Sequence, residues 1–169
     1  MGLPSIDITF KTAAQVTIAM GDKGYVGLIV RDTKQAGAHY LTRASKIPAE
    51  LTADNKAYIE RAFAGYVNPP KGVYVYVTDE EDVNLAEALA YFATQEVDYL
   101  CGPPDIEEAE AQAVESWLKE RREAHSHIKA VLPKLVADYD PVIDFDADGM
   151  TDGTKTYTAA HRSRSSSTA

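Results

Sequence analysis

The chain has 169 residues, of which 45% are hydrophobic and 25% are charged, and this composition is typical of a globular protein that buries a core. Its 26 acidic residues outnumber its 17 lysines and arginines, giving a net charge of −9. We therefore expect no nucleic-acid partner, because phosphate-binding surfaces are basic. No apolar run approaches the length of a membrane span, so membrane insertion is not expected. The single cysteine excludes an internal disulfide and fits a reducing compartment.

The first strand-like segment is "SIDITFK", near the start of the chain. Ile6, Ile8 and Phe10 alternate with polar residues there, which predicts a strand with one apolar face. The start of the chain has neither a basic region nor a long apolar region, so a secretory signal is not expected. Two further strand-like runs, "VTIAM" and "YVGLIV", are separated by the turn sequence "GDKG". "HYLTRAS" is interpreted as a continuation of this extended region.

From Thr52 onward the apolar period changes to that of a helix, which we expect to end at Gly65. "VYVYV" is the next strand, and a second helix is expected to begin at Thr78 or Asp79. A long helix over about 106–124 follows the strand "VDYLC" and precedes the strands "HIKAVL" and "VIDF". Its inward residues are expected to be Ala113, Val114, Trp117 and Leu118. The alternation predicts an α/β fold, with a mostly parallel sheet covered by helices on both faces.

The pattern divides the chain into three expected parts. An extended N-terminal β arm occupies residues 1–20, and the α/β domain occupies residues 21–158. Residues 159–169 contain "HRSRSSST", which is rich in Ser and Arg and has no apolar period. This tail is expected to be disordered, because it lacks apolar surface to offset the entropy of ordering.

The segment "DFDADGMTDGTK", residues 144–155, has the spacing of a calcium loop over most of its length. Acidic residues or Gly occupy positions 1, 3, 5, 6 and 9 of an EF-hand pattern, but position 12, which requires Glu, is Lys155. The segment also follows a predicted strand, whereas an EF-hand loop follows a helix. We interpret its aspartates as turn residues, and a calcium-binding module is the disfavoured alternative.

Other candidate chemistry is sparse. "GDKGYVG" lacks the G-x-G-x-x-G spacing of a dinucleotide loop, and His125 and His127 lack further metal ligands nearby. Cys101 ends a predicted strand, where α/β folds place active sites, but no base can be assigned to it. We predict no catalytic, cofactor-binding or metal-binding residue. A small α/β enzyme or ligand-binding domain near the strand ends around Cys101 is the alternative.

An ordered series of segments resembles the start of tail sheath proteins from contractile-tailed phages and from prophage-like elements of Gram-positive bacteria. The series begins with "GLPSIDITFKTAA" and "GYVGLIVRD" and continues through "IPAELTADNKAYIERAFAGYVNPPKGVYVYV". It goes on with "VDYLCGP" and "IKAVLP" and ends with "VIDFDADGMTDGTKTYTAA". The resemblance covers about residues 2–160. The N-terminal segment and "GYVNPPK" are its most specific parts.

This resemblance implies a structural protein that is not an enzyme and needs no cofactor. Sheath subunits stack as rings around a tail tube protein, and their contraction drives the tube through the bacterial envelope. The implied partners are copies of the chain itself and the tube protein. The implied locations are the host bacterial cytoplasm during assembly and then the tail of a phage-like particle.

The resemblance also implies a role for the N-terminal arm. In this family, terminal arms add strands to sheets of neighbouring subunits, so Ile6, Ile8 and Phe10 are the expected subunit interface. Sheath proteins are longer than this chain, and the sequence departs from theirs at His161. The resemblance thus implies the N-terminal portion of a sheath subunit, truncated or frame-shifted after about residue 160.

Overall fold

A computed structural model describes residues 24–64, 69–79, 85–132 and 139–144, and the backbone of 150–151 and 156–157. The predicted arm, with Ile6, Ile8 and Phe10, lies outside the described residues, as do the predicted strand "VTIAM" and the tail 159–169.

A six-stranded sheet forms the centre of the domain, in the order β2-β3-β1-β4-β5-β6. Neighbouring strands are parallel except for β2, which runs antiparallel to β3 at one edge. The strands are β1 (Tyr25–Arg31), β2 (Gly37–Leu41), β3 (Gly72–Thr78), β4 (Tyr99–Cys101), β5 (Lys129–Leu132) and β6 (Val142–Asp144). A separate two-stranded antiparallel sheet joins β7 (Met150–Thr151) to β8 (Thr156–Tyr157).

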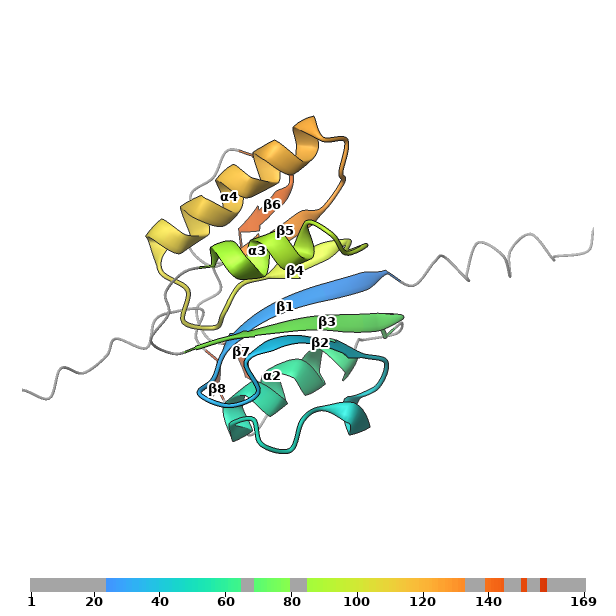
Figure 1. The fold of residues 1–169 in the computed structure, drawn as a ribbon. Helices are drawn as coiled ribbons and strands as arrows, with labels where there is room; N and C mark the ends of the chain where they lie inside the picture. The colour runs from blue at the N-terminus through green and yellow to red at the C-terminus, as the bar shows by residue number, and fades with distance from the viewer. Residues whose placement is uncertain are drawn as a thin grey trace, which may run out of the picture.

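Helices lie on both sides of the main sheet (Figure 1). Helix α2 (Ala53–Ala64) and the short 3-10 helix η1 (Ala44–Lys46) are on one side. Helices α3 (Ala86–Phe92) and α4 (Glu108–Glu123) are on the other. The predicted fold class, a mostly parallel sheet between helices, is confirmed.

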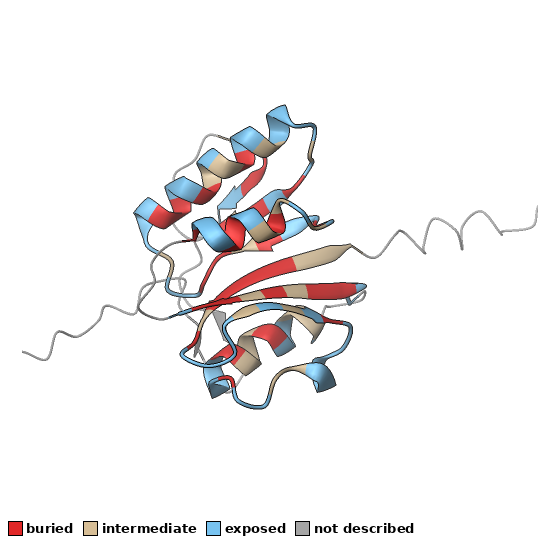
Figure 2. Ribbon diagram, viewed as in Figure 1, coloured by how far each residue is buried: buried red, intermediate tan, exposed pale blue. Residues whose placement is uncertain are grey.

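Two hydrophobic clusters, one on each side of the sheet, form the core (Figure 2). Ile29 of β1 packs in the cluster with α3 and α4, whereas Leu28 and Val30 pack in the cluster with α2. A strand buried on both faces reads as a continuous apolar run, which explains "LIV" in β1. Gly27 permits close packing, because a Cβ at this position would lie 2.8 Å from Cε1 of the fully buried Phe92.

Several predicted boundaries were wrong. Strand β2 ends at Leu41, and part of the predicted strand "HYLTRAS" forms η1 instead. Thr78 does not begin a helix, because it is the last residue of β3 and its hydroxyl donates to the Val30 carbonyl. On α4, Ala111 is buried and the predicted inward residue Ala113 is exposed. These errors concern where elements begin and end and which residues of a helix face the core, and they leave the order of the elements unchanged.

Candidate functional site

Polar side chains gather at the carboxyl end of β1, the central strand of the sheet. β1 pairs with β3 on one side and with β4 on the other. The connection to β3 runs through α2 on one face of the sheet, and the connection from β3 to β4 runs through α3 on the opposite face. In open α/β sheets, ligands bind beyond the carboxyl ends of the strands at such a change of direction. The carboxyl end of β1 is therefore the place where an α/β fold would bind a ligand.

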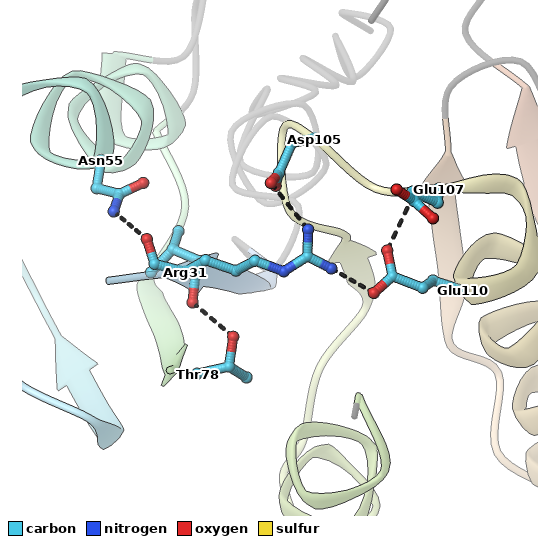
Figure 3. Close-up of polar contacts among 7 residues, drawn as sticks. Arg31, Asn55, Thr78, Asp105, Glu107 and Glu110 are labelled. Atoms are coloured by element: carbon cyan, nitrogen blue, oxygen red, sulfur yellow. Dashed lines mark hydrogen bonds and ion pairs between the residues drawn. The ribbon is translucent and has the colours of Figure 1, made fainter. Parts of the chain in front are cut away.

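Arg31, the last residue of β1, reaches across to the β4–α4 connection and the first turn of α4 (Figure 3). Its Nη1 lies 2.9 Å from Oδ2 of Asp105, and its Nη2 donates to Oε1 of Glu110. The side chains of Arg31 and Glu110 are only 12% and 8% exposed. The other Glu110 oxygen accepts the Glu107 backbone N–H at 2.9 Å. Glu110 thereby joins the start of α4 to the end of β1.

The charge of Arg31 is retained despite its burial. Removal from water alone would lower its pKa, but hydrogen bonds to Glu110 and Asp105, together with their negative charge, raise the pKa of Arg31 above its ordinary value. Buried charges are tolerated when they are paired and hydrogen-bonded in this way. The arrangement is therefore a satisfied ion-pair network.

Asp32 directly follows β1 and makes contacts on the side of the sheet that α2 covers. Its buried carboxylate accepts the Thr52 backbone N–H at 2.8 Å, the Asn55 amide at 3.0 Å and the Lys34 backbone N–H at 3.1 Å. The Asn55 amide also donates to the Arg31 carbonyl at 2.7 Å. Burial alone would raise the pKa of Asp32, but these hydrogen bonds outweigh it and the pKa is lowered. Asp32 thus fixes the start of α2 against the end of β1.

This cluster does not have the properties of an open catalytic site. The pKa shifts of Arg31 and Asp32 both favour the charged form, whereas a general acid or base needs a pKa near the working pH. Within the described residues, every buried side-chain nitrogen and oxygen has a hydrogen-bond partner. The polar groups therefore bind one another, and their contacts hold the starts of α2 and α4 in place.

Cys101, the alternative site, ends β4 on the side of the sheet that α2 covers. Burial raises the pKa of the Cys101 thiol to about 11. The neighbouring Tyr58 donates its hydroxyl hydrogen bond to the Gly102 carbonyl at 3.0 Å, and burial, followed by the Cys101 charge, raises the pKa of Tyr58. The thiolate is the reactive form of cysteine, and this thiol is protonated at neutral pH. Among the residues that the structure describes, none is placed as an activating base for Cys101.

The two candidate metal segments have different surroundings. His125 and His127 are exposed, and His125 adopts a φ of 61° just beyond the end of α4. Asp144 is the last residue of β6, so the calcium-like segment follows a strand as predicted; most of its other residues lie outside the described ranges. In the described part of the chain, no three His, Cys, Asp or Glu side chains are grouped as metal ligands. No helix in that part combines the length and the apolar character that crossing a membrane requires.

The two residues that organise the carboxyl end of β1 were not predicted from the sequence. Arg31 and Asp32 form the end of "GYVGLIVRD", and neither was given a role. Their signal was a charged pair directly after a buried strand, which places polar side chains at a strand end. The predicted interface residues of the arm lie outside the described residues.

The fold defines an α/β domain in which the polar residues at the carboxyl end of β1 contact the starts of α2 and α4. No protein-family model matches the chain. It is 35% identical over 157 residues to the tail sheath protein of Clostridium phage phiCD119. The match covers 90% of this chain but 44% of that protein, so the chain spans less than half of the relative's length. The resemblance to phage tail sheath proteins is thereby confirmed.

Proposed function

We propose that the chain is a structural subunit, the N-terminal portion of a phage-like contractile tail sheath. The observation that carries this proposal is the 35% identity to a phage tail sheath protein over 157 residues. Similarity that extends over 90% of the chain is not confined to one motif. The proposed location is the tail of a phage-like particle, after assembly in the host bacterial cytoplasm.

The polar edge of the sheet supports a structural role over the alternative of a small enzyme. Arg31 forms ion pairs with Asp105 and Glu110, and Asp32 accepts a backbone hydrogen bond at the start of α2. Cys101 is a half-buried thiol whose pKa is raised. The residues at the position where an α/β enzyme binds its substrate thus hold the domain together.

In the proposed assembly, copies of the chain contact one another in rings around a tail tube protein and contract to drive that tube through the bacterial envelope. The N-terminal arm supplies one contact, by adding its strand to a neighbouring copy. Burial of Ile6, Ile8 and Phe10 would contribute roughly 1.5–3 kcal/mol per side chain before ordering costs. The isolated chain is expected to associate weakly.

Sedimentation velocity of the purified protein tests the arm. Replacing Ile6, Ile8 and Phe10 together with Ser should abolish self-association and leave the circular dichroism spectrum unchanged. A matched control replaces Ser5 and Thr9, on the opposite face of the same strand, with Ala and should associate like the wild type. If the triple variant unfolds, the segment belongs to the domain's own core and the arm is not an assembly contact.

A further inference from the structure

A shallow surface hollow lies on the α2 side of the domain. It has a volume of about 550 Å³ and is lined by Thr42, Arg43, Ala44, Phe63, Pro69, Pro70 and Lys71. Its lining combines two exposed cations with the apolar rings of one Phe and two Pro residues. Such a surface suits an acidic partner that also brings aliphatic groups, because charge and apolar contact act together there.

The charges of the chain are distributed unevenly between the two sides of the sheet. Residues 42–71, which include η1 and α2, contain five basic and three acidic residues, although the whole chain has a net charge of −9. Residues 86–124, which include α3 and α4, contain ten acidic and three basic residues. Because α2 and α4 lie on opposite sides of the sheet (Figure 1), the segment with more basic residues is on one side and the strongly acidic segment is on the other.

The hollow and the most acidic part of α4 also lie at opposite ends of the sheet. Pro69, Pro70 and Lys71 directly precede the amino end of β3, whereas α4 begins after the carboxyl end of β4. β3 and β4 are both parallel to β1, so the amino end of β3 and the carboxyl end of β4 lie at opposite ends of the strands. Glu107 and Glu108, at the start of α4, are exposed. The two surfaces of one copy therefore face away from each other.

We propose that the hollow around Arg43 and Lys71 binds the acidic first turn of α4, with Glu107 and Glu108, of a second copy of this chain. The opposite charges of the two surfaces select this occupant. A contact between two different surfaces is head-to-tail, and repeated contacts of this kind build rings or open helical arrays. The inference rests on the proposed sheath role, and the contact strengthens an association that depends on the N-terminal arm.

Charge-reversal variants test the contact by sedimentation velocity. Arg43→Glu places a carboxylate in the hollow and should weaken self-association roughly tenfold or more, because like charges then meet across the interface. Lys34→Glu makes the same charge change at an exposed position in the β1–β2 turn, outside the hollow, and should have little effect. Wild-type association should also weaken in about 1 M salt, where the Debye length falls to about 3 Å.

A charge swap identifies the partner surface. Glu108→Arg alone should weaken association as Arg43→Glu does, and the double variant Arg43→Glu/Glu108→Arg should restore it, since each hollow then meets an α4 of opposite charge. Single variants that associate like the wild type overturn the contact but leave the arm-mediated assembly standing. A double variant that stays as weak as the singles also overturns it and indicates a different occupant, such as the tube protein. A wild-type chain that is monomeric at every salt concentration overturns the contact, whereas the sheath role is judged separately by labelling of tails.

Discussion

Arg31 donates a hydrogen bond to Glu110, although 79 positions separate the two residues in the sequence. The bond joins the end of the central strand β1 to the first turn of α4, and the same carboxylate accepts the Glu107 backbone N–H. Because both side chains are largely removed from water, the pair fixes the start of α4 against the end of β1.

Arg31→Met should destabilise the domain by roughly 3–5 kcal/mol, because Glu110 is left as an unpaired buried charge. The double variant Arg31→Met/Glu110→Leu should recover most of the loss, since it removes both charges. Lys119→Met is the control: it breaks the pair between the exposed Lys119 and the half-buried Glu115 and should cost less than about 1 kcal/mol. Urea denaturation measures all three. A single Arg31 variant as stable as the Lys119 control would show that the network contributes little.

Asp32 should make the domain sensitive to acid. Its pKa is lowered in the folded state, so its stabilising effect is complete above the unfolded value of about 3.9 and is lost as pH falls through the lower folded value. At neutral pH, Asp32→Asn should lower the free energy of unfolding by about 1.5–3 kcal/mol or more, since three hydrogen bonds lose their charged acceptor. The difference from wild type should shrink below pH about 4. Unfolding free energies across pH check this, and a difference that is constant with pH would contradict it.

The thiol of Cys101 should be unreactive in the folded protein. Its pKa is raised to about 11 by burial, so at pH 8 almost none of it is the nucleophilic thiolate. Labelling with iodoacetamide, followed by mass spectrometry, should be slow in buffer and fast in urea, where the thiol is exposed and its pKa is ordinary. Equal rates in the two conditions would contradict this prediction, and faster labelling in buffer than in urea would show an activated cysteine and favour the enzyme alternative.

Calcium should not stabilise the protein. Lys155 occupies the loop position that needs Glu, and the segment follows strand β6. A ligand at 100 times its dissociation constant would add about 2.7 kcal/mol of stability, which a thermal melt detects readily. We expect equal melting temperatures with millimolar calcium and with millimolar magnesium. A rise specific to calcium would show that the segment binds the ion.

The fold class could be predicted because each element carries its own period. The buried run in β1 and the alternation of Val and Tyr in β3 are local patterns that survive in the structure as buried and half-buried residues. The Arg31–Glu110 pair could not be predicted, because it depends on the strand order that places β4 beside β1. The error between Ala111 and Ala113 has a related cause, since small residues occur at both positions and only the packing of α4 decides which one is buried.

The claim that the chain is a tail sheath subunit is tested most directly by immunogold electron microscopy. The particles are phage-like particles induced from a bacterium that carries this gene, and the antibody is raised against the α/β domain. The account predicts gold particles along the length of the tails and none on the heads. Unlabelled tails in a lysate where the chain is abundant but remains in the soluble fraction would contradict it.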